Sequence, residues 1–177
     1  MLSDRIIPTP VAPSVATFTV LSAGTEVPRE FQVLSMVINK AVNRIATATL
    51  ILRDGDPAAQ TFTASEEDYF VPGKELELKA GDQGTEDKIF SGVVVSHAIR
   101  VRDQRSVLEV VCKDPAFKMT LSPENRYFRD TTESDALEDI IRASGLTAEV
   151  EATTEAKAEI IQYHCTNWDF VLTRADA

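Results

Sequence analysis

The sequence predicts a mainly β protein, with an antiparallel β-barrel-like domain followed by part of an α+β domain. Apolar and polar residues alternate with a period of two from Thr17 to Asp114, as expected for half-buried strands. Helical spacing of apolar residues dominates only after Asp114, and the chain closes on an amphipathic segment. We therefore predict an extended N-terminal arm over residues 1–14, a barrel-like domain over 15–114 and the start of a second, truncated α+β region over 115–177.

The first 114 residues contain three prolines in the arm and then about six strand patterns. Pro8, Pro10 and Pro13 lie among small residues, which favours an extended arm. Turn signals such as Asp54-Gly-Asp-Pro separate the strands. The acidic run 65–68 is interpreted as part of a loop. The predicted strands are 17–21, 31–39, 46–53, 75–79, 89–101 and 107–113, the last two forming a hairpin.

The segment after Asp114 mixes helix and strand signals. Residues 115–119 favour a helical turn, and Ser134 is a predicted N-cap for a helix with Leu137 and Ile140 on its apolar side. Gly145 fits the position that ends this helix. Residues 147–153 and 159–163 are predicted as strands.

The closing helix is predicted to begin after Thr166, which is a suitable N-cap with Asp169 in the first turn. Its apolar face is expected to contain four residues at helical spacing, Trp168, Val171, Leu172 and Ala175. No Gly, Pro or polar tail follows this helix before Ala177. We therefore expect the chain to be the front part of a longer protein.

Composition excludes several classes of function. Hydrophobic residues make up 44% and charged residues 26%, and no run of about 18 apolar residues could cross a membrane as a helix. The N-terminus lacks a signal peptide, so we expect synthesis in the cytoplasm and, if the protein leaves the cell, export by a separate machine. The formal net charge of −10 and the absence of a basic cluster argue against nucleic-acid binding.

The residues that could carry chemistry do not form a recognisable catalytic or metal-binding motif. The two histidines and two cysteines lack metal-ligand spacing. His97 is interpreted as a barrel residue on one strand face with Val93, Val95, Ile99 and Val101 rather than as a base. His164 and Cys165 are adjacent, so their side chains should diverge rather than form a nucleophile–base pair. Asp54 and Asp56 are interpreted as a solvated turn rather than a calcium site. We predict no enzyme activity, cofactor or metal.

The C-terminal stretch carries a family resemblance. Gln162-Tyr163, followed by Trp168-Asp169-Phe170 and Arg174-Ala175, resembles a signature of VgrG spike proteins of type VI secretion systems and related contractile injection machines. Two upstream segments strengthen this resemblance, the strand Phe90-Ser-Gly92-Val-Val and the passage Asn125-Arg-Tyr-Phe128 toward Ser134. A Gly inside a strand also marks a bend or close backbone approach.

The resemblance implies a phage tail hub-like fold and a structural function. VgrG proteins form a homotrimeric hub that joins the tube protein to a needle, contacts baseplate components and can carry effector cargo. The assembly candidates here are Gly92, Gln162, Tyr163, Trp168, Asp169, Phe170 and Arg174. For Trp168 we favour a core position over an interface anchor, and for Gln162 and Arg174 a polar network between strand and helix. The alternative function is a small-ligand or carbohydrate-binding β-barrel with a concave pocket.

Overall fold

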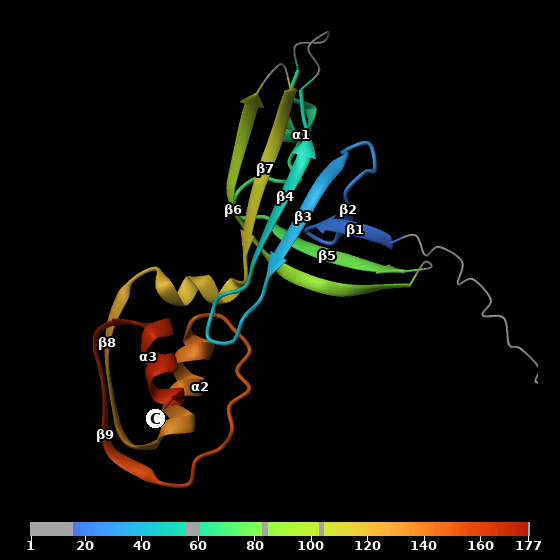
Figure 1. The fold of residues 1–177 in the computed structure, drawn as a ribbon. Helices are drawn as coiled ribbons and strands as arrows, with labels where there is room; N and C mark the ends of the chain where they lie inside the picture. The colour runs from blue at the N-terminus through green and yellow to red at the C-terminus, as the bar shows by residue number, and fades with distance from the viewer. Residues whose placement is uncertain (1–15, 56–60, 83–84, 103–104, 177) are drawn as a thin grey trace, which may run out of the picture.

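The computed structural model describes residues 16–55, 61–82, 85–102 and 105–176, so the predicted N-terminal arm lies outside the described residues. The described chain forms two regions with separate hydrophobic cores (Figure 1). A seven-stranded sheet spans most of the first 113 residues, and a hairpin with two helices follows. We call them the sheet region and the hairpin region.

The sheet region is wholly antiparallel, with strand order β2-β1-β5-β6-β7-β4-β3. All six predicted strands are present, and a short additional strand, β2, follows the turn at Gly24. The strands are β1 Ala16–Ser22, β2 Thr25–Glu26, β3 Val33–Asn39, β4 Thr47–Arg53, β5 Glu75–Asp82, β6 Thr85–Arg102 and β7 Arg105–Lys113. The mainly antiparallel β fold class is therefore confirmed.

The core of the sheet region follows from the alternation in its strands. On β4, Ala48, Leu50 and Leu52 are fully buried, whereas the intervening residues are only half-buried. Register places Leu50 between Met36 of β3 and Val110 of β7, so apolar side chains meet across three strands. Such cross-strand packing of a single face stabilises an antiparallel sheet.

Strand β6 changes which of its residues face the core because it contains a bulge between Val94 and Ser96. Val94 is buried opposite Cys112, and His97 lies opposite the buried Val110. The extra residue shifts the alternation by one, as a bulge does. The prediction that His97 shares a face with Val93 is therefore wrong, because the sequence pattern does not reveal the bulge.

The sheet is curved but has two edges, β2 and β3, and no ladder between these strands closes it within the described residues. A hollow of about 230 Å³ between the edges is lined by Phe18, Val27 and Val33 among others. The first region is thus barrel-like in its curvature and filled core, while its ends do not pair.

The hairpin region contains β8 (Pro123–Thr132) paired antiparallel with β9 (Ala156–Thr166), together with helices α2 (Glu133–Ala143) and α3 (Asn167–Ala175). The predicted turn after Asp114 is the 3-10 helix η1 (Pro115–Thr120), begun by the Asp114 carboxylate that accepts from Ala116 N at 2.9 Å. Residues 147–153 are not a strand, so that prediction is wrong. The strand partner of β9 is β8 instead, a segment for which no strand was predicted.

Helix α2 begins two residues earlier than predicted. Its N-cap is Thr132, whose hydroxyl accepts from Asp135 N at 3.1 Å, rather than Ser134. The Ser134 hydroxyl instead accepts from Thr153 N at 3.1 Å, and this bond fastens the irregular segment after the helix. Gly145 ends α2 with a φ of 75°, as predicted.

Helix α1 (Thr63–Glu66) is a single turn held by Asp54. The Asp54 carboxylate is only 4% exposed and accepts from the backbone N–H groups of Gly55, Ala64 and Ser65 at 2.9–3.1 Å. Asp54 therefore belongs to a structural turn and is not solvated, contrary to the sequence interpretation; Asp56 lies outside the described residues. None of the helices in the described part of the chain is long and apolar enough to cross a membrane.

Candidate functional site

The predicted assembly residues fall in two places. Six of them, from Gln162 to Arg174, lie on β9 and α3, whereas Gly92 lies on β6 in the core of the sheet region. The structure thus brings the C-terminal candidates together and leaves Gly92 apart from them.

Gln162 anchors a buried polar network between β9 and the two helices. Gln162 is 1% exposed. Its side-chain nitrogen donates to the side-chain oxygen of Asn167 at 2.9 Å and to the backbone carbonyl of Cys165 at 3.1 Å. The Asn167 amide then donates to the Ser144 hydroxyl at 3.3 Å, which reaches the end of α2. A polar network from strand to helix is present, but its helical member is Asn167 rather than Arg174.

Arg174 instead joins α3 to the start of α2. Its guanidinium lies 3.2 Å from a Glu133 carboxylate oxygen and 5.5 Å from the centre of the Phe170 ring. Phe170 is 6% exposed and packs in the second core. Of the predicted apolar face of α3, Trp168 and Val171 pack against the second core and Ala175 is exposed, so the prediction is right only in part. The most deeply buried residues of the helix are Asn167 and Phe170.

Asp169 and Thr166 form the N-terminal cap of α3, as predicted. The Thr166 hydroxyl accepts from Asp169 N at 3.1 Å and donates to the Asp169 carboxylate at 2.6 Å. This arrangement satisfies a free N–H of the first turn and places a negative charge at the positive end of the helix. The N-terminal cap of α3 therefore accounts for the presence of Asp169 in the C-terminal motif.

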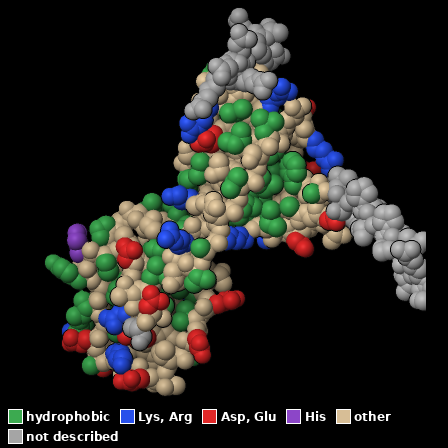
Figure 2. Space-filling view, in the orientation of Figure 1, with side chains coloured by type: hydrophobic (Ala, Val, Ile, Leu, Met, Phe, Trp, Pro, Cys, Tyr) green, Lys and Arg blue, Asp and Glu red, His purple; other side chains and the backbone are tan. Residues whose placement is uncertain are grey.

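Tyr163 faces outward from the hairpin. It is 80% exposed, and Ile161 and Tyr127 on the same side are 51% and 45% exposed. In Figure 2, hydrophobic side chains gather along the left edge of the lower region, where Figure 1 places β8 and β9. Arg129 lies 4.9 Å from the centre of the Tyr127 ring and borders this apolar surface.

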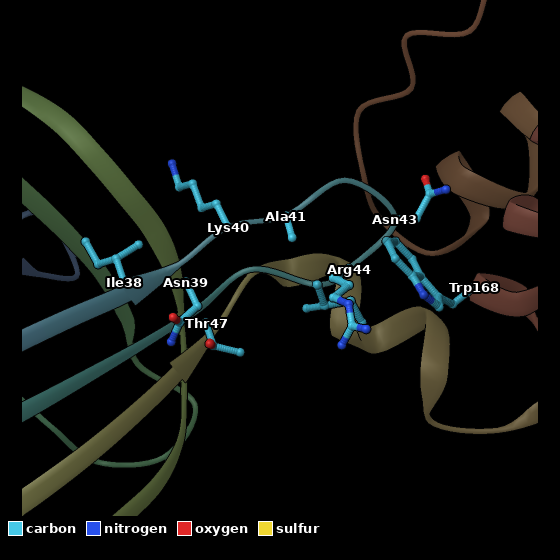
Figure 3. Close-up of a pocket in the computed structure, with 9 residues that line it drawn as sticks. Ile38, Asn39, Lys40, Ala41, Asn43, Arg44, Thr47 and Trp168 are labelled. Atoms are coloured by element: carbon cyan, nitrogen blue, oxygen red, sulfur yellow. The ribbon is translucent and has the colours of Figure 1, made fainter.

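Trp168 lies at the junction of the two regions. It is half-buried, packs on the edge of the second core and lines a hollow of about 800 Å³ under the β3–β4 loop (Figure 3). The other lining residues come from the ends of β3 and β4 and the loop between them, among them Asn39, Lys40, Asn43 and Arg44. Trp168 therefore combines a core contact with a surface position.

Gly92 is required by close backbone approach. A Cβ atom at this position would lie 2.5 Å from the Lys113 carbonyl oxygen and 2.7 Å from the Phe90 ring. Distances under about 3 Å are not tolerated between such atoms, so no side chain fits here without movement of β7. Close packing around this position therefore explains why the strand motif has Gly here.

Among the described residues, the side chains that were weighed as catalytic candidates are not arranged as a nucleophile–base pair or a metal site. Burial raises the pKa of the Cys112 thiol to about 12, which makes it a poor nucleophile. His164 has a positive φ of 46° and its backbone N–H donates to the Asn125 side chain, and within the described chain no hydrogen bond joins the side chains of His164 and Cys165. Among those residues no group of three or more His, Cys, Asp or Glu side chains could hold a metal ion.

Sequence reasoning missed Asn167 and assigned other roles to Ser134 and Asp54; the polar groups of all three are buried and bonded to distant parts of the chain. Asn167 follows directly after the cap residue Thr166, and this position is the only sequence signal that could have identified it.

Comparison with known proteins identifies the family and the fold. The family described as the Alg8 N-terminal domain matches residues 12–177, so the chain belongs to that family. No curated protein matches the chain.

Solved structures share the fold at low sequence identity. The prophage MuSo2 43 kDa tail protein from Shewanella oneidensis has a TM-score of 0.66 at 12% identity, and a tail protein from Neisseria meningitidis has 0.58 at 14%. A chain of the Francisella PdpA–VgrG complex has 0.57 at 8%. Each similarity covers 91% of this chain but only 48%, 45% and 25% of the other chain, in the same order. The chain therefore has the fold of phage tail proteins and spans at most about half their length.

Proposed function

We propose that this chain is part of a trimeric hub that joins the tube to the needle of a contractile injection machine, of the VgrG type or a related one. The observation that carries the proposal is the extent of the fold likeness. The likeness to each of two tail proteins covers 91% of this chain and therefore includes both the sheet region and the hairpin region. We further propose that the two regions are separate domains, with a boundary between residues 114 and 115.

The exposed strand edge of β3 supports an assembly function. Leu34 and Val37 on this edge strand are 57% and 50% exposed, and the strand has neither the Lys nor the Pro that commonly protects an edge. A second copy of the chain that packs on β3 would cover both side chains. In such a contact, β3 of one copy meets a different surface of the next copy. Repeated contacts of this kind close into a ring of three when neighbouring copies are related by a threefold rotation.

The filled interior of the sheet counts against the alternative, a ligand-binding barrel. Leu50, Leu52, Leu78 and Leu108 occupy the concave side of the sheet and are completely buried. A pocket for a small ligand or a carbohydrate needs an open, concave lining in this place. Hub partners such as the tube protein, baseplate components and effector cargo belong to the proposal.

The mass of the full-length protein in solution tests the trimer. Light scattering coupled to size exclusion should give three times the chain mass, and Leu34→Lys with Val37→Lys should shift the population toward monomer. Val101→Lys, at a 65% exposed residue near the far end of β6, is the matched control and should leave the trimer intact. A monomeric full-length protein would overturn the hub assignment, and an intact trimer in the double variant would overturn the contact through β3.

A further inference from the structure

The hollow beside Trp168 has a charge unlike that of the rest of the chain. Its nine lining residues include two cations, Lys40 and Arg44, and no acidic residue. The whole chain has 28 acidic against 18 basic residues and a net charge of −10. The hollow is therefore a locally basic site on an acidic protein, which favours a negatively charged occupant.

Neither cation is used for internal pairing in the described structure. Lys74, Arg100 and Arg174 have carboxylate partners at 2.6–3.2 Å, whereas no described carboxylate lies within ion-pair distance of Lys40 or Arg44. Both side chains are exposed on the loop between β3 and β4. Their charges are thus available to a ligand without the cost of breaking an existing pair.

The rest of the lining suits a peptide. Asn39 and Asn43 are exposed and offer amide donors and acceptors, while the half-buried Trp168 supplies an apolar wall from the other region (Figure 3). The loop is shaped by a turn in which Arg44 N donates to the Ala41 carbonyl at 3.3 Å, with Asn43 at a φ of 58°. Asn is among the few residues that adopt this conformation readily.

We infer that the hollow formed by Lys40, Asn43, Arg44 and Trp168 binds an extended acidic peptide segment of a partner protein. Lys40 and Arg44 pair with carboxylates of the segment, the asparagines bind its backbone and Trp168 packs against an aliphatic side chain. A nucleic acid fits less well, because two cations neutralise few phosphates and the net charge of −10 repels a polyanion. This inference goes beyond the hub function, since it requires neither a trimer nor a needle.

The position of Trp168 provides a direct test, because it is the single tryptophan of the chain. We would titrate the protein with an acetylated and amidated decapeptide of alternating Glu and Ala and follow the tryptophan emission. Saturable binding should weaken with added salt and should fall roughly tenfold in affinity in the Lys40→Ala, Arg44→Ala double variant. The same peptide with Gln in place of Glu should not change the emission.

A matched variant controls for the loss of two charges. Lys79→Ala with Lys88→Ala removes two cations from the sheet, where both pair with Glu77, and should leave the affinity within about twofold. Unchanged thermal melting of both double variants shows that folding is intact. Equal binding of the Glu and Gln peptides, equal loss in both double variants, or tighter binding of a single-stranded thymidine decamer would each overturn the inference.

Discussion

The two regions of this molecule are stabilised in different ways. The sheet region buries fifteen side chains in one cluster, nearly all aliphatic or aromatic, whereas the hairpin region buries six apolar side chains. The hairpin region also buries three polar side chains: Gln162 bonds to Asn167, Asn167 bonds to Ser144 at the end of α2, and Ser134 bonds to Thr153. Apolar burial thus dominates in the first region, and directional hydrogen bonds set the geometry of the second.

This difference has a consequence for how each region tolerates change. A large apolar core loses stability in proportion to the volume removed, whereas a small core with a buried polar network fails when one partner is deleted. The single tryptophan reports on the hairpin region, whereas far-UV circular dichroism reports on both regions, so a step of the dichroism signal that the tryptophan does not follow reports on the sheet. Two probes can therefore follow the two regions in one unfolding experiment.

The largest expected effect comes from a matched pair of Phe→Ala substitutions. Phe70 is completely buried in the sheet core with its ring edge against Phe31, at 6.5 Å between ring centres. Phe170 is 6% exposed in the smaller core. Phe70→Ala should lower the free energy of unfolding by about 4–5 kcal/mol and Phe170→Ala by about 3 kcal/mol.

Urea unfolding monitored by both probes checks this pair. Phe70→Ala should move the circular dichroism transition, and Phe170→Ala should move the tryptophan transition. Equal shifts of both transitions in both variants would show that the two regions unfold as one unit, and the comparison between them would fail.

The polar network should give the next largest effect. Gln162→Leu keeps the side-chain volume about the same but leaves the side-chain oxygen of Asn167 and the backbone carbonyl of Cys165 without their donor. The cost should be about 1–3 kcal/mol in the tryptophan-detected transition. Gln32→Leu, at an exposed residue of the sheet region, is the control and should change stability by less than about 0.5 kcal/mol. A neutral Gln162→Leu would mean that apolar packing, not the network, holds the hairpin region.

The same contrast explains which features could be predicted from the sequence. The strands of the sheet region were predictable, because residues such as Leu50 and Leu52 alternate with half-buried neighbours. Strand β8 was not, because it begins with Pro123, none of its residues is fully buried, and it exists through its pairing with β9. The caps at Thr166 and Gly145 have local signals, whereas the bonds of Asn167 and Asp54 join distant segments and have none.

The helix caps should give a smaller effect. Thr166→Ala removes the acceptor for Asp169 N and should cost about 1 kcal/mol. Thr132→Ala at α2 should cost less, because the nearby Ser134–Thr153 bonds remain. Thr173→Ala, at an exposed residue within α3, should be neutral or slightly stabilising, since Ala favours the helix. Thermal melting ranks the three variants, and a cost for Thr173→Ala as large as that for Thr166→Ala would contradict the capping argument.

The smallest effect at neutral pH concerns the two cysteines, one in each region. Cys112 is completely buried, and burial raises its pKa to about 12, whereas Cys165 is half-buried. In the folded protein at pH 8 a disulfide reagent should therefore modify one thiol, at Cys165, and should modify both after addition of urea. Because burial raises the pKa of Cys112 in the folded protein, this group's contribution to stability is fully present below its ordinary pKa of 9.0. That contribution should fall as the pH rises from 9 toward about 12, and Cys112→Ala should remove this pH dependence from the circular dichroism transition. Rapid modification of Cys112 in the folded protein would show that the sheet region opens more readily than its core implies.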